Sequence, residues 1–273
     1  IACGQGDFLH LLCELGGNRG IGFDPSYTPG RSDAVSATPG LRFVADYYSE
    51  AHAEVAADLI CCRHALEHMA RPVEFLRGLR RTVGDRPTVL FFEVPNSLYT
   101  LGDLGVWDLI YEHCGYFWAG SLATAFERAG FRGTRLATEF GGQYLTIDAV
   151  PGVAPGAGAG DSGGLTTDLQ SVVQLASRFG DAYRARLEHW RAVLDRLRGQ
   201  HRRAVLWGAG SKGVSFVNAL LAGDVIDCLV DLNPHKHGRF VPGTGHEVRA
   251  PESLAARPPD AVIVMNPLYA GEI

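Results

Sequence analysis

ACGQGDFL, at residues 2–9, sets two glycines directly before a segment whose apolar residues recur at helical spacing. Glycine lets the backbone turn sharply and approach a ligand closely. The next apolar run, residues 20–23, is a predicted strand that ends at Asp24. In nucleotide-binding α/β domains, an acid at the end of the strand that follows the glycine loop holds ribose hydroxyls with its carboxylate. A further predicted strand, residues 41–45, ends at Asp46, so the glycine pair and the two acids together predict a nucleotide-binding sheet.

Short apolar runs alternate with helical segments through the first half of the chain. After the segments above, the pattern predicts strands at 58–62, 88–94, 134–139 and 144–150 and helices at 73–83 and 121–129. Alternating β and α segments indicate a largely parallel sheet covered on both faces. We therefore expect an α/β domain over residues 1–150.

The second half begins with a break in composition. Residues 151–165 read PGVAPGAGAGDSGGL, which cannot bury apolar area and predicts a flexible linker. Residues 166–200 carry one apolar stripe at helical spacing, which predicts a long connecting helix that packs on a domain rather than a coiled coil. A second α/β pattern then predicts a smaller Rossmann-like domain over 201–273, with strands at 204–207, 226–230 and 261–265 and a helix at 214–221.

Composition excludes several classes of function. The 273 residues are 46% hydrophobic, which is enough to bury a sizeable core, and the formal net charge of -5 argues against a nucleic-acid partner. No apolar run reaches the roughly 20 residues of a transmembrane helix, and no signal peptide is visible. The six cysteines form neither a CxxC pair nor a metal-ligand spacing with histidine. We therefore expect a cytoplasmic protein with no membrane partner and no bound metal.

Lysine usage singles out two loops of the second domain. Only two of the 25 basic residues are lysines: Lys212 in GAGSKG (208–213) and Lys236 in DLNPHKHGRFVPGTG (231–245). Where arginine is the default cation, a lysine suggests a need for a compact ammonium group. Contact with a phosphate is weighed against a solvated loop charge for both residues.

The first glycine loop lacks marks of a dinucleotide site. Leu9 stands where the dinucleotide fingerprint has its third glycine, and Asp7 would repel phosphate at the start of the helix. Together with DLICCRHALEH at 58–68, these residues resemble class I S-adenosylmethionine-dependent methyltransferases; another nucleotide-binding Rossmann domain is the alternative. The resemblance assigns the loop Gly4, Gln5 and Gly6 to the methionine end of S-adenosylmethionine, Asp24 to its ribose and Asp46 to its adenine.

The loops at 206–213 and 230–245 are distinctive together and resemble the C-terminal domain of sugar C-methyltransferases. Members of that family act on nucleotide-linked, typically dTDP-linked, keto-deoxysugars in antibiotic biosynthesis. The resemblance spans the chain apart from the linker and implies a nucleotide-sugar substrate, with a substrate-side or structural role for the second domain. It also implies a zinc module before Ile1, and we expect the chain to be a fragment cut at both ends.

Methyl transfer to carbon requires a base that forms an enolate beside a ketone. In IYEHCGYF (110–117), His113 is the candidate base and Glu112 its orienting carboxylate, although surface Glu–His pairs are common. Tyr111 and His64 are candidate donors to the enolate or sugar oxygens; a structural role for His64 is equally weighted, and His68 is expected to be structural. The segment 96–110 is long enough to cover the active site.

Two other functions compete with sugar C-methylation. An O- or N-methyltransferase of another small molecule would keep the S-adenosylmethionine site and need no enolate. An NAD(P)-dependent oxidoreductase would use GAGSKG as a second dinucleotide loop, with Asp231 as its acid. The sequence leaves the sugar, the methylated carbon and the oligomeric state open.

Overall fold

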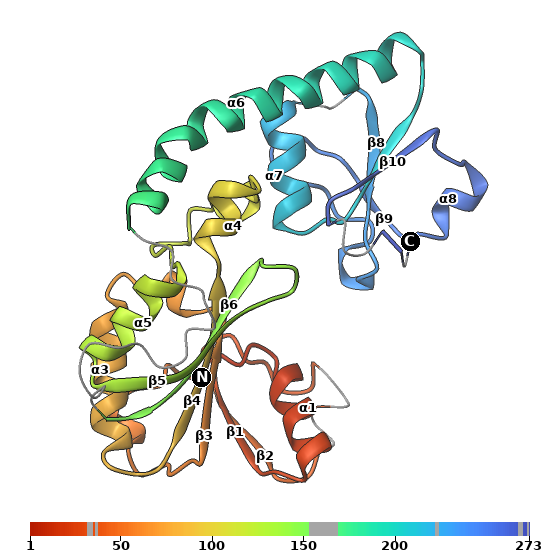
Figure 1. Cartoon of the computed structure of the whole chain (residues 1–273). Coiled ribbons are helices and arrows are strands. Elements are labelled where there is room, and N and C mark those ends of the chain that lie inside the picture. The colour runs from red at the N-terminus through yellow and green to blue at the C-terminus, as the bar shows by residue number, and fades with distance from the viewer. Residues whose placement is uncertain (32–34, 36–37, 153–168, 222–223, 267–269, 272) are drawn as a thin grey trace. The chain divides into compact units, whose positions relative to one another are not determined.

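The computed structural model describes residues 1–31, 35, 38–152, 169–221, 224–266, 270–271 and 273 (Figure 1). The chain divides into two compact units, Ile1–Ser97 with Tyr111–Leu169, and Leu98–Ile110 with Gln170–Ile273. Most of the predicted linker, and the start of the helix predicted after it, lie outside the described residues.

The first unit is built on two groups of strands joined by the start of the chain. One group is the parallel pair β1–β2, and the other has the order β3–β4–β6–β5, in which β6 runs antiparallel to both neighbours. Between the groups, the Cys3 N–H donates to the Phe23 carbonyl (3.3 Å) and the Ile1 nitrogen donates to the Cys61 carbonyl (2.7 Å). The strands are β1 (Gly20–Phe23), β2 (Leu41–Val44), β3 (Leu59–Arg63), β4 (Val89–Pro95), β5 (Phe131–Glu139) and β6 (Tyr144–Pro151).

This order places a topological switch at residues 1–3. The chain leaves them for β1 and β2 on one side and later continues with β3 and β4 on the other. In open α/β sheets ligands bind outside the carboxyl ends of the strands at such a point. Asp24 follows β1 and His64 follows β3, and the glycine loop follows residues 1–3, which lie between these two strands.

Helices cover both faces of these strands. Figure 1 shows α3 and α5 to one side of the strands and α1 to the other. The helix α3 begins at a proline, whose fixed backbone suits the first turn, and α5 buries Leu122 and Phe126 beside Phe92 of β4. The helices are α1 (Asp7–Gly16), α3 (Pro72–Val83) and α5 (Ala119–Arg128), with short 3₁₀ turns η1 (Glu50–His52) and η2 (Leu66–His68).

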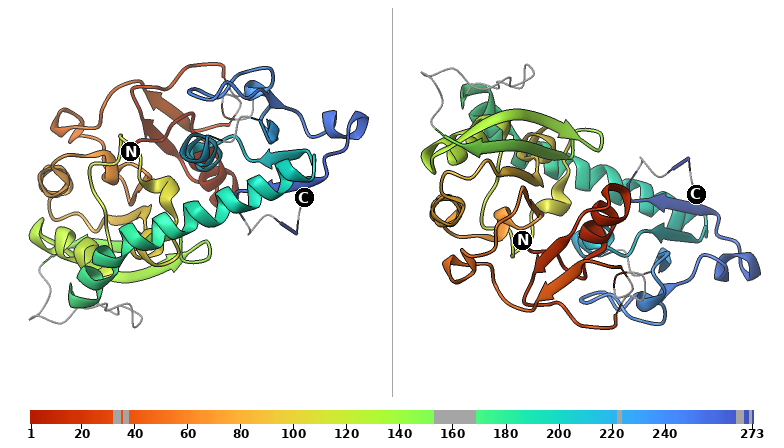
Figure 2. Two further views of the ribbon diagram at one scale, coloured as in Figure 1. Left: turned by 90° about the horizontal axis from the view of Figure 1, so that it is seen from above. Right: turned by 90° about the horizontal axis from the view of Figure 1, so that it is seen from below.

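The second unit has a parallel sheet of order β10–β7–β8–β9. The long helix α6 (Leu169–Gly199) is continuous in both views of Figure 2, and its C-terminal half packs Leu187, Trp190, Leu194 and Leu197 on the core of this unit. This half of the predicted apolar stripe is therefore confirmed. The other elements are β7 (Ala204–Trp207), α7 (Ser211–Leu220), β8 (Ile226–Val230), η4 (Pro234–Lys236), β9 (Val248–Arg249), α8 (Ser253–Ala256) and β10 (Ala261–Val264). Among the described residues, no helix combines the length and apolarity needed to cross a bilayer.

The segment after β4 groups with the second unit, although the sequence placed it in the first domain. It contains most of α4 (Ser97–Gly102) and the 3₁₀ turn η3 (Val106–Asp108), which packs against α7. The Lys212 ammonium lies 4.3 Å from the centroid of the Trp107 ring, a cation–π distance. Sequence order alone could not reveal this grouping, because the segment is inserted between two elements of the first unit.

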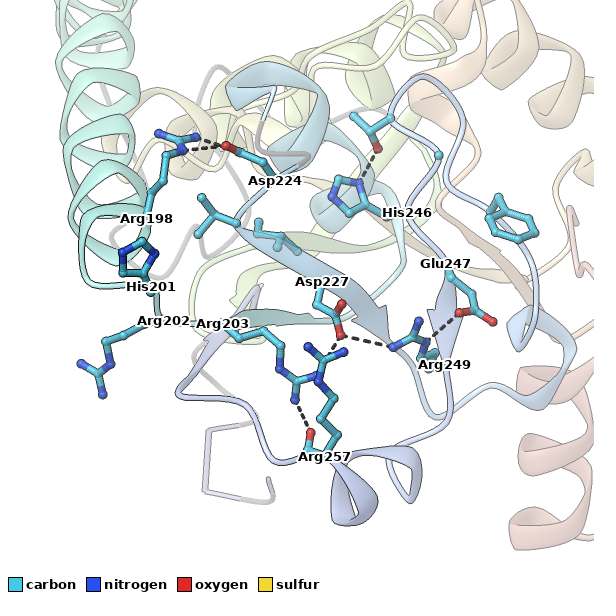
Figure 3. A pocket seen from close by; sticks show the side chains of 15 residues that line it. Arg198, His201, Arg202, Arg203, Asp224, Asp227, His246, Glu247, Arg249 and Arg257 are labelled. Carbon is cyan, nitrogen blue, oxygen red and sulfur yellow. Dashed lines mark hydrogen bonds and ion pairs between the residues drawn. The ribbon is translucent and has the colours of Figure 1, made fainter.

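An arginine-rich hollow of about 690 Å³ lies at the amino ends of the strands in the second unit (Figure 3). Asp224 accepts two hydrogen bonds from Arg198 (2.6 and 2.7 Å), and Asp227 accepts from Arg203 (2.9 Å) and Arg249 (3.2 Å). These pairs tie the end of α6 and β9 to the start of β8. The lining carboxylates are thus already occupied by arginines, which favours a structural interpretation of the hollow.

Candidate active site

The glycine loop and the acid after β1 are brought together as the sequence predicted. Gly4 and Gly6 have φ of +56° and +95°, and the Gly4 N–H donates to one Asp24 carboxylate oxygen (2.8 Å). The other oxygen accepts from the Ser26 N–H (2.8 Å) and hydroxyl (2.6 Å). Burial acts to raise the pKa of Asp24, but these hydrogen bonds outweigh it and lower the pKa below its ordinary value. Asp24 is therefore an ionised acceptor.

The residues around this loop have different tasks. A Cβ on Gly4 would meet no atom within 4 Å, whereas one on Gly6 would lie 2.5 Å from the Phe43 ring. The Gln5 amide is already engaged, since it donates to the Ser26 carbonyl (2.9 Å) and accepts from the Thr28 N–H (3.2 Å). Gly4 thus leaves room for a ligand, while Gly6 and Gln5 shape the loop.

Asp46 lies after β2 and is exposed. Its carboxylate accepts the N–H of its neighbour Tyr47 (2.7 Å). A cavity of about 930 Å³ extends from the glycine loop along β1 to Arg63 and His64 at the end of β3. Asp46 is not among the residues that line this cavity.

His64 is held by Glu93. Its φ of +50° is left-handed, which costs a non-glycine residue about 1 kcal/mol, and its N–H donates to the Glu93 carbonyl (2.9 Å). The imidazole Nε2 lies 2.9 Å from a Glu93 carboxylate oxygen that also accepts from Arg63 (2.7 and 2.9 Å). Burial acts to raise the pKa of Glu93, but His64 and Arg63 outweigh it and lower the pKa. This geometry gives His64 Nε2 a structural partner, and its Nδ1 lies 3.9 Å from a Glu67 carboxylate oxygen.

The buried carboxyl group of Glu67 lies close to the imidazole rings of three histidines. Glu67 on η2 is 1% exposed, and one of its oxygens is 3.9 Å from His64 Nδ1. The rings of His68 and His113 meet edge to face with centroids 4.8 Å apart. One ligand-type atom from each of Glu67, His68 and His113 lies within 4.8 Å of the other two. Burial raises the pKa of Glu67 above its ordinary value.

The structure changes how the motif at 110–117 is understood. Tyr111 is fully exposed, the Glu112 residue is also exposed, and the carboxyl group clustered with His113 is that of Glu67. Glu112 contacts this cluster through its backbone carbonyl, which lies 3.0 Å from His68 Nδ1. Because a carbonyl only accepts, His68 must donate from Nδ1, which leaves Nε2 as the acceptor in the neutral ring.

Sequence analysis missed Glu67 and placed His68 outside the site. The available signal was their position, because both lie within four residues of His64 and after the same strand. Their link to His113 comes from the loop 113–115, whose Cys114 and Gly115 N–H groups donate to the Glu67 carbonyl (2.8 and 2.9 Å). That contact joins residues far apart in the chain and leaves no local pattern.

Two imidazoles and a carboxylate are also a metal-ligand set. Atoms bound about 2.1 Å from one tetrahedral ion lie about 3.4 Å from each other. The ligand-type atoms of Glu67, His68 and His113 are separated by up to 4.8 Å. The arrangement as it stands therefore suits proton transfer better than chelation.

The two lysines of the second unit each have a partner. The Lys236 ammonium lies 2.9 Å from an Asp231 oxygen, which also accepts the Ala209 N–H (2.9 Å). Burial lowers the pKa of Lys212, whose ammonium lies over Trp107. Phosphate contact by either residue remains a prediction.

Comparison with known families gives one match for each half of the chain. Residues 1–136 match the family described as a methyltransferase domain, and residues 168–273 match the C-methyltransferase C-terminal domain. Both parts of the chain are therefore similar to C-methyltransferases or methyltransferase domains. The C-methyltransferase NovU of Streptomyces niveus is 27% identical over 291 residues, which cover 99% of this chain and 66% of NovU. The chain therefore spans about two thirds of the length of that curated relative.

Solved structures resemble about half of this chain. The protein bound to the Haloferax volcanii Trm112 methyltransferase activator is 16% identical, with a TM-score of 0.45 over 55% of this chain and 80% of that one. The methyltransferase CalO6 is 20% identical, with a TM-score of 0.43 over 54% of each chain. The strand order and the matched families confirm the predicted fold class, a class I methyltransferase sheet followed by a smaller Rossmann-like α/β domain.

Proposed function

We propose that this protein is a C-methyltransferase, which transfers a methyl group from S-adenosylmethionine to a carbon of a nucleotide-linked, dTDP-type keto-deoxysugar. The observation that carries the proposal is that two features both follow the carboxyl ends of strands in the first unit. These are a glycine loop with an ionised acid and, after β3, a cluster of imidazoles over a buried carboxyl group. The C-methyltransferase NovU and the C-terminal family match support carbon as the acceptor.

The loop of the first unit fits an adenosyl ligand. Asp24 is ionised and can accept both ribose hydroxyls, Gly4 leaves open space beside it, and Gly6 and Gln5 hold the loop in shape. Asp46 is proposed to contact the adenine. When bound, S-adenosylmethionine supplies an electrophilic methyl group and takes up the electron pair of the broken sulfur–carbon bond.

The imidazole cluster supplies the base. His113 takes the proton from the carbon beside the ketone, and the electron pair of that C–H bond becomes the enolate that attacks the methyl group. An imidazole base at hydrogen-bond distance contributes about 10²- to 10⁴-fold to such a step. His64 and Tyr111 are proposed to donate to the enolate or sugar oxygens, and Glu112 to help orient the base.

The second unit is proposed to bind the substrate's phosphates through Lys212 and Lys236. Each ammonium would then exchange its present partner, the Trp107 ring or the Asp231 carboxylate, for a phosphate oxygen. A small, mobile ammonium group makes such an exchange easier than a guanidinium bound at two points.

His113→Ala tests the base directly. We expect methyl transfer to a dTDP-linked keto-deoxysugar, and hydrogen exchange at its carbon beside the ketone, to fall about 10²- to 10⁴-fold together. His235→Ala, an exposed histidine of the second unit, is the control. Normal rates of both reactions would remove His113 from the base role. If the product instead carries its new methyl group on oxygen or nitrogen and the deuterium at that carbon is retained, the protein is an O- or N-methyltransferase.

A further inference from the structure

Glu67 is the buried titratable group at the centre of the site, and the proposed mechanism gives it no task. It lies on η2, beneath His68 and His113, with 1% of its surface exposed. One carboxylate oxygen, Oε2, has no hydrogen-bond partner among the described residues. Burying a carboxylate oxygen without a hydrogen-bond partner costs free energy, so we expect the oxygen to gain a favourable contact when the protein acts.

The residue also holds the loop that carries the candidate base. Its backbone carbonyl accepts the N–H groups of Cys114 and Gly115, directly after His113. The same residue therefore fixes the loop through its backbone and directs a carboxyl group toward the ring through its side chain. Truncating the side chain would leave the backbone contacts in place, so the two roles can be separated.

We propose that Glu67 is a positioning residue whose carboxylate faces the His68–His113 pair and stabilises the imidazolium formed when that pair takes a proton from the substrate carbon. The inference rests on the proposed function. The proton leaves the C–H bond and stays on the imidazole, while Glu67 keeps its charge. A buried carboxylate next to an imidazole base plays this part in the Ser-His-Asp arrangement, where it orients the ring and is not itself protonated.

The other charged groups around the pair leave this task to Glu67. His64 Nδ1 lies 3.9 Å from a Glu67 oxygen, but its Nε2 is bound to Glu93, which also binds Arg63. The Cys114 thiol lies 3.6 Å from the carbonyl of His68 and carries no charge in its thiol form. The His68 Nδ1 atom lies 3.0 Å from the carbonyl of Glu112, which carries no net charge.

The test is Glu67→Gln, which keeps the shape and removes the charge. Without the carboxylate the imidazolium is less stable, so the base is weaker. We expect methyl transfer and substrate hydrogen exchange to fall about 10- to 100-fold, and the acid limb of the pH–rate profile to move to lower pH. Affinity for S-adenosylhomocysteine should stay within twofold, and Glu127→Gln, an exposed glutamate on α5, should match the wild type.

Two further variants keep the result decisive. Glu67→Asp retains the charge and should keep the wild-type acid limb with a smaller loss of rate, even if Glu67→Gln folds poorly. Glu112→Gln should change the pH profile less than Glu67→Gln, because Glu112 meets His68 through its backbone. A normal rate and profile in Glu67→Gln, or a larger shift in Glu112→Gln, would overturn the inference.

A measurement without substrate separates this inference from the proposed function. Glu67→Gln should change the ¹⁵N signals of the His68 and His113 rings in the free protein. If those signals change while the wild type methylates no keto-deoxysugar, the proposed substrate fails and the carboxylate–imidazole coupling stands. If methyl transfer is found but the signals and pH profile do not change, the coupling fails. Co²⁺ absorption bands that depend on Glu67 would show a metal centre and also overturn the inference.

Discussion

The two glycine loops of this chain share a local design and differ in one charge. Asp24 accepts the Gly4 N–H (2.8 Å) and the N–H two residues beyond itself (2.8 Å). Asp231 accepts the Ala209 N–H (2.9 Å) and again the N–H two residues beyond itself (2.9 Å). In the second loop Lys236 forms an ion pair with the acid, whereas Asp24 has no such ion pair within the described ranges of the chain.

The difference shows that two loops of the same form can hold their acids in different electrostatic states. An acid that holds ribose must be free to accept hydroxyl groups. Asp231 is instead neutralised by a neighbour five residues away. Both acids have lowered pKa values against the effect of burial, but from different causes, serine and backbone donors for Asp24 and an ammonium group for Asp231. This contrast argues against a second dinucleotide cofactor.

The largest expected effect comes from the glycines. A Cβ on Gly213 would lie 2.0 Å from the Gly208 carbonyl oxygen, so Gly213→Ala must separate α7 from β7. We expect a loss of about 3 kcal/mol in the stability of the second unit. Gly4→Ala should cost only about 1 kcal/mol, from its left-handed backbone, yet weaken S-adenosylhomocysteine binding. Chemical denaturation measures the stability of both variants, and calorimetry measures their affinity for S-adenosylhomocysteine. Equal stability losses in the two variants would contradict the different roles assigned to the two glycines.

The acids give the next largest effect. Asp24→Asn removes the charged acceptor for the ribose and should weaken S-adenosylhomocysteine binding about 30-fold, corresponding to about 2 kcal/mol. Asp231→Asn should change that affinity less than twofold, because its carboxylate is bound to Lys236. Isothermal titration of the two variants decides the point. Equal losses would mean that the second loop also contributes to the cofactor site.

The smallest effect concerns the ion pair itself. The pKa of folded Asp231 is lowered, so its contribution to stability is present above the unfolded pKa of about 3.9 and is lost as pH falls through the folded value. Lys236→Met should therefore cost about 1 kcal/mol or less at pH 7, and this difference should vanish in acid. Thermal unfolding from pH 7 to pH 3 measures it. A difference that grows toward low pH would contradict the pairing.

Sequence reasoning worked best where the information was local. The strand β1 and its acid, the strands β7 and β8, and the helix α3 follow from apolar periodicity and from the residues that end each element. The helix α7 begins at Ser211 rather than at the predicted 214, because its first turn carries polar and glycine residues that hide the helical period. Lys212 consequently lies in a helix rather than a loop.

What sequence reasoning did not find depended on contacts between distant residues. A carboxylate next to a histidine in sequence suggested that Glu112 orients His113, but the group that the fold brings into the cluster is Glu67, from another loop. Adjacent residues often point in different directions, whereas burial beneath two rings requires the tertiary structure. The chain order likewise assigned residues 98–110 to the first domain, and only their packing on α7 revealed the second unit.

That insertion has a consequence for dissecting the enzyme. The chain crosses between its two units after Ser97, again after Ile110 and once more after Leu169. Cleavage by a protease within 153–168 would give two polypeptides, and the first would still carry residues 98–110 of the second unit, so we expect the packing of η3 on α7 to hold the products together non-covalently. A recombinant piece ending near residue 150 would carry Trp107 away from Lys212 and α7 and expose it to solvent. To express the first unit alone, residues 98–110 would be replaced by a short turn. To express the second unit alone, residues 98–110 would be joined by a linker to the segment 170–273.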